Sequence, residues 1–295
     1  MNETRFRFLN EERKRELVKN WRKFSSNPLS IVGLISVLIV LFLAIFAPWV
    51  APYPQSWGRW VDFNNVLKPP SWTNWMGTDN FGRDIMSRIF FGFRYDLMMA
   101  AAILVMVVPL GTILGLIAGY FSGTFIDTII MRVTDVFLAI PSLVLALAIC
   151  SLLEPSLFNS MMAVSVLWWP WYSRLSYGIA ISLKNEYFVQ ASELIGASTP
   201  HILFREILPN CLSPIFTKMT LDVGWVILIG ASLAFVGLGA QEPIPALGNM
   251  VSAGTKYMPD YWWMTIFPAI AIAFTILGFN LLGDGIRDLL AVEEV

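Results

Sequence analysis

The chain has 295 residues, of which 56% are hydrophobic and only 14% are charged. Because soluble domains carry about 25% charged residues, this composition excludes an ordinary soluble protein and indicates a membrane protein. A net charge of −1 provides no basic field for nucleic acid, and two cysteines with a single histidine supply no set of metal ligands or catalytic groups. We therefore expect no metal site, no enzyme active site and no nucleic-acid partner.

Six strongly apolar runs follow one another along the chain, and a bilayer-spanning helix needs about 20 such residues. Backbone polar groups cannot stay unpaired in lipid, and no alternating pattern suggests a barrel. The runs therefore predict an all-α polytopic membrane protein with six transmembrane helices. In chain order, the expected spans cover residues 29–51, 97–126, 129–152, 158–181, 214–238 and 262–283.

Lysine and arginine predict the orientation of these spans. Eight of the twenty basic residues precede residue 24, which places the N-terminus in the cytoplasm. Six spans then return the C-terminus to the cytoplasm as well. We expect three parts: a basic cytoplasmic tail at residues 1–27, a first helix with a long outer loop at 28–96, and a five-helix core domain at 97–290.

The same topology places a polar loop at residues 184–210 in the cytoplasm, within which residues 186–210 read EYFVQASELIGASTPHILFREILPN. We expect a first short helix with Asn185 as its N-cap and Gly196 as its stop. One face of this helix is apolar, because four residues recur at helical spacing: Tyr187, Ala191, Leu194 and Ile195.

A second short helix is expected after Thr199, with Thr199 as its cap and Pro200 at its first position. Its apolar stripe consists of Ile202, Leu203 and Ile207, and Leu208-Pro209 is expected to end it. Apolar surface on such a hairpin favours a partner. The alternative is that the two helices lie on lipid headgroups or pack beneath their own bundle.

This loop resembles the EAA loop of ABC-type importer permeases. That loop carries Glu-Ala-Ala, a glycine four residues later and a terminal Leu-Pro. The matching residues here are Gln190, Ala191, Ser192, Gly196, Leu208 and Pro209. Two of the three signature letters depart from the pattern, whereas the spacing to the glycine and to Leu-Pro holds.

Longer segments extend the resemblance from about residue 28 to residue 290. GASTPHILFREILPN, which contains Ala197, Ser198 and Pro200, is similar to the peptide-permease version of the loop. The segments MGTDNFGRDIMSRIFFGFRYDL, VTDVFLAIPSLVLAL, FVGLGAQEPIPALGNM and FNLLGDGIRDLL resemble other parts of the same permeases. The chain thus resembles the C-type permease subunit of dipeptide and oligopeptide importers, with the transmembrane fold of type I ABC importers.

The resemblance implies a division of labour in a multi-pass cell-membrane (inner-membrane) complex. The loop would form a coupling helix that docks on a cytoplasmic ATPase. The chain has no G-x-x-x-x-G-K-[ST] motif, so ATP and Mg would be bound by two partner ATPase subunits, and no cofactor is expected in this chain. The other expected partners are a second homologous permease, an extracytoplasmic substrate-binding protein and membrane lipid.

The expected cargo is di- or oligopeptides, and the alternatives are oligosaccharides or nickel carried by the same type of importer. A stand-alone secondary transporter is the alternative from another class. It would favour paired broken helices or rings of charge, and neither is evident in the sequence.

Several further residues are candidates for function or for packing. Asp222 has no obvious partner in the sequence and is a candidate for the translocation path, because a charge within a span is a functional hypothesis by default. Arg132 and Asp135 are spaced for a pair within one helix.

The stripe of Gly111, Gly115 and Gly119 predicts close helix packing. Three charged residues precede the second span and could contact an outer partner or brace that span: Arg83, Asp84 and Arg88.

Overall fold

The structure is a computed structural model that describes residues 18–290, and the basic residues before 18 and the last five residues lie outside the described part. The described residues are mainly helical and contain no β-strand beyond one isolated bridge. In chain order the elements are α2 (Pro28–Val50), η1 (Pro54–Trp57), η2 (Phe63–Asn65), α3 (Ile85–Tyr120), α4 (Phe125–Ala139), α5 (Ser142–Ser151), α6 (Leu157–Lys184), α7 (Tyr187–Leu194), α8 (Thr199–His201), η3 (Ile202–Ile207), α9 (Leu208–Phe235), α10 (Leu247–Thr255) and α11 (Trp263–Leu290).

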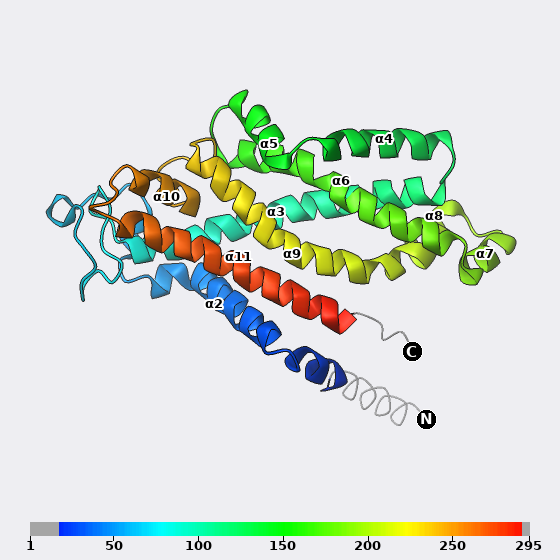
Figure 1. Ribbon diagram of the computed structural model, residues 1–295, viewed down its shortest axis with the longest axis horizontal. Helices are drawn as coiled ribbons and strands as arrows, with labels where there is room; N and C mark the ends of the chain where they lie inside the picture. The colour runs from blue at the N-terminus through cyan, green and yellow to red at the C-terminus, as the bar shows by residue number, and fades with distance from the viewer. Residues whose placement is uncertain (1–17, 291–295) are drawn as a thin grey trace.

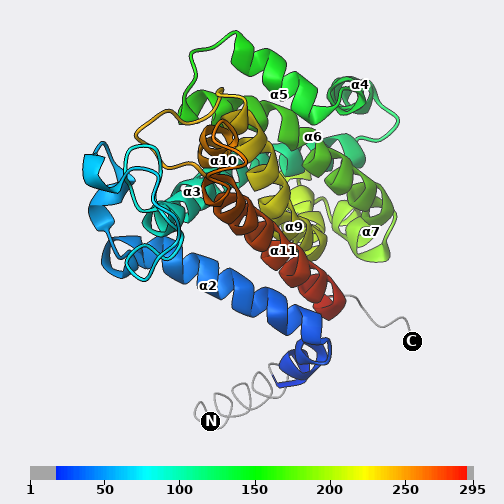
Figure 2. The same cartoon turned by 60° about the vertical axis from the view of Figure 1, so that its left-hand side comes forward.

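The long helices run along the long axis of an elongated bundle (Figure 1). One end holds the loop between α2 and α3 together with α10. At the other end α7 and α8 project beyond the last turn of α11 (Figure 1). Helix α2 lies at the edge of the bundle alongside α11, as both views show (Figure 2).

Four helical segments are long and apolar enough to cross a membrane, and the count is five if the bent pair α4 and α5 forms one span. The four segments are Pro28–Val50, Ile85–Tyr120, Thr199–Phe235 and Trp263–Leu290. Helix α6 has 28 residues, about 42 Å, but its composition is less apolar. The bundle is therefore the expected all-α membrane fold, while the count of six spans and the side of the termini stay predictions.

The helix that contains the second expected span, 97–126, begins earlier, at Ile85, and ends at Tyr120. Asp84 caps it, because the Asp84 side chain accepts a hydrogen bond of 2.8 Å from the backbone N–H of Ser87. The added turns contain Arg88 and Asp96, both buried. By composition, charged residues argue against a membrane-spanning helix at these positions. In the structure these turns pack against other parts of the chain, and a hydropathy pattern does not include contacts with residues that are distant in the sequence.

The third expected span, 129–152, is broken into two helices, and its prediction as one helix was wrong. Helices α4 and α5 meet at an angle of 87°. The break falls at Ile140-Pro141, where Ile140 is extended with φ −97° and ψ 131°. Proline has no N–H for the helix ladder and disfavours helical backbone in the residue before it, which accounts for the position of the bend.

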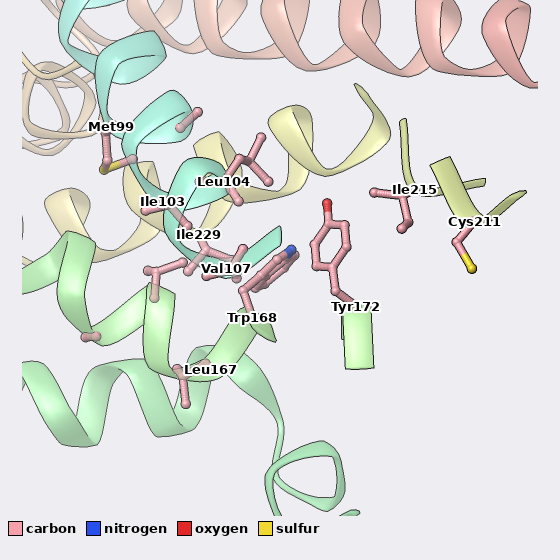
Figure 3. Close-up of a cluster of buried hydrophobic side chains, with 14 of the residues drawn as sticks. Met99, Ile103, Leu104, Val107, Leu167, Trp168, Tyr172, Cys211, Ile215 and Ile229 are labelled. Carbon is pink, nitrogen blue, oxygen red and sulfur yellow. The ribbon is translucent and has the colours of Figure 1, made fainter. Parts of the chain in front are cut away.

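The three glycines of α3 pack against α6, as the stripe predicted. A Cβ added to Gly111 or Gly115 would lie 2.3 Å or 2.2 Å from a backbone carbonyl oxygen of α6, and one on Gly119 would lie 2.6 Å from the Cβ of Ala180. The two backbones therefore touch. Around this contact, α3, α6 and α9 bury a shared apolar core (Figure 3), which includes Ile103, Leu104, Val107, Leu167, Trp168 and Ile229.

Candidate functional site

Helix α7 is anchored to the bundle on one side only. Val189 is fully buried in the core shared by α3, α6 and α9. The Tyr120 hydroxyl at the end of α3 donates a 2.8 Å hydrogen bond to Oε1 of Glu193, which adds a second attachment. The N-cap of α7 is Glu186, and Asn185 instead ends α6, so the prediction of Asn185 as N-cap was wrong by one residue.

The opposite face of α7 is apolar and exposed. Tyr187, Leu194 and Ile195 are 87%, 88% and 85% exposed, and Ala191 is exposed as well. These four residues are the face that the helical spacing predicted. Large apolar side chains held out from a fold on a short, anchored helix form a surface suited to a partner.

The EAA-like residues lie along α7 and its turn. Gln190 and Ala191 are exposed and Ser192 is half-buried. The Gln190 side chain donates a 3.0 Å hydrogen bond to the carbonyl oxygen of Asn185, within its own loop. The first two signature positions therefore present side chains outward, next to the apolar face.

Gly196 ends α7 in the left-handed conformation, with φ +81°. Its N–H donates to the carbonyl of Glu193, and the N–H of Ala197 donates to the carbonyl of Ser192, both at 3.0 Å. This pair of hydrogen bonds is a Schellman motif, which requires a positive φ at the glycine position and sets a fixed angle between the two arms. No atom lies within 4 Å of the place where a Cβ would sit, so the constraint at Gly196 is conformational.

The second arm begins at Ser198, the N-cap, with Pro200 in the first turn, so the cap lies one residue before the predicted Thr199. It does not end at Leu208-Pro209 as predicted, because residues Thr199–Phe235 form one helix of 37 residues. The predicted stripe of Ile202, Leu203 and Ile207 exists but is buried against the bundle.

A π-helical segment, η3, precedes Pro209 in this long helix. Pro209 lacks the N–H for one backbone hydrogen bond of the helix, and the wider π-helical turn allows the helix to continue past this residue. The side chain of Asn210 donates a 2.7 Å hydrogen bond to the carbonyl oxygen of Glu206. The polar loop at residues 184–210 is thus joined directly to the apolar part of α9 instead of being separated from it by a turn.

Asp222, the candidate for the translocation path, is 3% exposed near the middle of α9. Its Oδ1 atom accepts a 3.1 Å hydrogen bond from Nζ of Lys218, one helical turn away. The expectation that Asp222 lacks a partner in the sequence was therefore wrong, and the i,i+4 spacing could have revealed the pair.

Arg83, Asp84 and Arg88 lie in a charged cluster at the end of the bundle that holds α10. Their exposures are 5%, 2% and 2%. Arg83 Nε lies 2.7 Å from Oδ2 of Asp79, and Arg83 Nη1 lies 2.9 Å from Oε2 of Glu242. Arg88 Nη2 lies 3.2 Å from Oε1 of the same glutamate. This placement favours bracing of α3 over direct contact with a partner.

Glu242, which the sequence did not single out, ties the start of α3 to the segment between α9 and α10. Burial alone would raise the pKa of its carboxyl, but Arg83 and Arg88 outweigh this and hold the pKa below its usual value. Its side chain remains 53% exposed, so solvent weakens each ion pair.

The expected pair of Arg132 and Asp135 within α4 was wrong. Asp135 forms its ion pair with Arg174 of α6, across the two helices. Both side chains are about half exposed, at 46% and 44%. Asp135 therefore pairs with Arg174 on a neighbouring helix and not with Arg132 on its own helix. Sequence spacing alone cannot distinguish between these two partners.

Comparison with known proteins identifies the family. Residues 111–292 match the family of binding-protein-dependent transport system inner membrane components, which is more than half of the chain. The chain belongs to this family. Residues 18–70 also match the N-terminal transmembrane domain of oligopeptide transport permease C. The protein is therefore a multi-pass inner-membrane transport component, and ATP hydrolysis is left to other subunits.

Relatives of the permease are similar along almost its whole length. The dipeptide transport system permease protein DppC of Escherichia coli is 42% identical over 277 residues, covering 92% of this chain and 91% of the relative. The probable D,D-dipeptide transport system permease protein DdpC of E. coli is 40% identical, covering 90% and 87%. The oligopeptide transport system permease protein OppC of Bacillus subtilis is 38% identical, covering 91% and 87%.

Among solved structures, the permease is similar in fold to a chain of the inward-facing MetNI methionine ABC transporter. The TM-score is 0.57, and the match covers 70% of this permease and 97% of that chain. At 16% sequence identity this similarity concerns the fold alone. It agrees with the type I ABC importer fold that the sequence predicted.

Proposed function

We propose that this permease forms one half of the path through an ATP-driven importer of di- and oligopeptides. The observation that carries the proposal is its 42% identity, over 92% of the chain, to a protein named as a dipeptide permease. The oligosaccharide and nickel alternatives draw no support from the relatives described above, which are named for dipeptides or oligopeptides.

The proposed contact with a cytoplasmic ATPase is the exposed face of α7. Three side chains that are at least 85% exposed, Tyr187, Leu194 and Ile195, offer an apolar stripe on a helix that Val189 holds in place. An amphipathic helix of this kind suits a groove on a partner. The fixed turn at Gly196 and the continuous helix after it would carry a rigid movement into the membrane.

The proposed assembly contains two ATPase subunits that bind ATP and Mg, a second homologous permease and an external substrate-binding protein. In this arrangement the end of the bundle with α7 faces the cytoplasm. Support comes from the eight basic residues before residue 24, a number typical of a cytoplasmic tail. Asp222 is proposed to lie on the path. Arg83, Asp84 and Arg88 are proposed to brace the outer end of α3 beneath a docking surface.

The test is purification of the tagged chain from its native membrane, followed by reconstitution of everything recovered with it. We expect two ATPase polypeptides, a second membrane permease and uptake of a labelled dipeptide that requires ATP. Competition by an oligosaccharide or by nickel would assign the cargo to an alternative. Uptake that is driven by an ion gradient and is indifferent to ATP would contradict the importer and support a secondary transporter.

A matched pair of variants tests the proposed docking face. Leu194→Ser and Ile195→Ser together remove exposed apolar area without touching the core, so the chain should insert normally but recover much less ATPase. Phe125→Ser removes a side chain that is 77% exposed on α4 and serves as the control. Equal recovery of the ATPase with both variants would refute docking through α7.

A further inference from the structure

A groove of about 450 Å³ lies between α2 and α3, and single residues of α9 and α11 complete its wall. Its volume is in the range of sites that hold a small molecule. Within the described chain, Arg94 is the only charged residue that lines it. The apolar lining includes Leu41, Ile45, Leu97, Met98, Ala101 and Phe279. The groove therefore combines one cation with an apolar wall.

Arg94 lacks a counter-charge, unlike two other arginines near the start of α3. Arg83 and Arg88 both form ion pairs with Glu242. Arg94 is exposed and forms no ion pair or hydrogen bond with other residues in the range 18–290. Asp96 lies only two residues away, but this spacing points it to another side of the helix, where it is buried. Because charged groups at membrane depth are almost always paired, Arg94 favours an anion from outside the chain.

The position of Arg94 along α3 is close to the expected level of the lipid headgroups. It lies nine residues, about 14 Å, from the first residue of the helix and three residues before the uncharged run that begins at residue 97. On α2, Ile45 lines the groove, and Trp49, one turn nearer the end of that helix, is 77% exposed. Exposed tryptophans near helix ends are typical of the boundary between lipid and water.

The apolar part of the groove extends from Arg94 toward the middle of the bilayer. Leu97 and Ala101 follow Arg94 at about one and two turns along α3, and Leu41 lies one turn deeper than Ile45 on α2. Ile45 and Leu41 are 59% and 36% exposed, so this wall is open in the described chain. The cation thus lies at headgroup level and the apolar wall at the level of the acyl chains.

We propose that this groove binds one phospholipid with an anionic headgroup. The guanidinium group of Arg94 would donate two parallel hydrogen bonds to the phosphate oxygens, the geometry that arginine favours with phosphate. One acyl chain would lie against Leu41 and Ile45 of α2 and Leu97 and Ala101 of α3. In the proposed orientation the lipid belongs to the outer leaflet. The inference concerns the membrane around the permease and is independent of the cargo.

Charge and shape together favour this occupant over others. Free phosphate would contact Arg94 but would leave the apolar wall uncovered. A phospholipid with a choline headgroup carries a second cation, which Arg94 repels. An apolar segment of a second permease would cover the wall but would leave Arg94 without an anion.

The test is photocrosslinking of the complete transporter, reconstituted in vesicles, with phosphatidylglycerol that carries a diazirine in one acyl chain. Arg94→Gln removes the cation and leaves the wall intact. Its matched control is Arg59→Gln, because Arg59 is exposed at the same end of the bundle and also forms no ion pair within residues 18–290. Ala101→Phe fills the wall and keeps the cation. Its control is Ala139→Phe, at an exposed position on α4, which does not line the groove.

We expect crosslinks in the segments 41–45 and 97–101. Arg94→Gln should lower their yield about fivefold, the effect of one basic side chain on the attraction of an anionic lipid. Ala101→Phe should lower the yield as well, whereas both control variants should match the unmodified permease. The same probe with a choline headgroup should crosslink about fivefold less and should not respond to Arg94→Gln. Excess inorganic phosphate should not compete.

Equal yields from phosphatidylglycerol with the unmodified permease and with Arg94→Gln would overturn the inference. Equal yields from the two headgroups would do the same, because the groove would then be a general apolar surface. Competition by inorganic phosphate would reduce the site to an anion site at Arg94. Crosslinks from segments 41–45 and 97–101 to a second permease, in place of lipid, would assign the groove to an interface between subunits.

Discussion

Substitution of Gly115 by alanine should loosen the contact between α3 and α6. The added Cβ would lie 2.2 Å from the carbonyl oxygen of Ser173, and such contacts do not fall below 3.0 Å, so the helices must separate by at least 0.8 Å, the difference between the two values. The obstacle is backbone, which cannot rotate away as a side chain can. Overpacking of this kind costs about 1–3 kcal/mol.

Gly178→Ala on α6 is the matched control, since nothing lies within 4 Å of the position of its Cβ. The same change there should stabilise the helix by about 1 kcal/mol through backbone propensity. The two variants should therefore differ by about 2–4 kcal/mol. At about 2–4 °C per kcal/mol, this corresponds to a difference in melting temperature of roughly 5–15 °C.

The assay is gel filtration of the detergent-solubilised permease after heating, with the surviving fraction plotted against temperature. Gly115→Ala should melt below the unmodified permease and Gly178→Ala at or above it. Equal melting temperatures for the two variants would show that α3 and α6 do not approach as closely as the structure has them, and would refute the reasoning.

Three further predictions concern the loop and the charged cluster. Gly196→Leu should uncouple ATP hydrolysis from uptake in vesicles. Gly196→Asn should keep most of the coupling, because asparagine tolerates a positive φ. Normal transport by the leucine variant would argue against the role of this turn. Val189→Asp places a charge in the core and should release α7 to limited proteolysis, whereas Leu194→Ser should not; equal protease resistance would contradict the anchoring. Glu242→Gln should lower the melting temperature at neutral pH because Arg83 loses a partner. Folding lowers the pKa of Glu242, so its carboxylate stabilises the fold above the ordinary pKa of 4.5, and this stabilisation is lost as the pH falls below that value. The difference in melting temperature between the unmodified permease and Glu242→Gln should therefore shrink in acid. A difference that does not change with pH would exclude the ion pairs as its cause.

The apolar face of α7 could be predicted because its signal is local. Tyr187, Ala191, Leu194 and Ile195 lie on one face of any helix, whatever the rest of the chain does. The glycine stripe of α3 was predictable for the same reason. Whether an apolar stripe is buried depends on the bundle. The equally clear stripe that contains Ile202 packs beneath its own bundle, which is one of the alternatives that the sequence left open.

The charged residues show where sequence alone fails. Arg83 meets Glu242 across 159 residues, and no spacing rule reaches that far. Hydropathy did not reveal the turns of α3 before residue 97, because it treats Arg88 as solvated, whereas here Glu242 and Asp79 form ion pairs with it. At Asp135 the local candidate Arg132 and the distant Arg174 are chemically equivalent, and only packing selects between them.

The unbroken helix from Thr199 to Phe235 has a mechanical consequence. Its 37 residues follow a helical path about 55 Å long, well beyond the hydrocarbon thickness of about 30 Å, and the path includes η3 and Pro214. A tilt of about 5° about one end therefore displaces the other by up to about 5 Å, one helical turn. If α7 docks on a partner as proposed, a small rotation there would produce a larger displacement at the end of α9, beside α10 at the opposite end of the bundle. Such a permease could open and close as a lever does, with its individual helices scarcely changing shape.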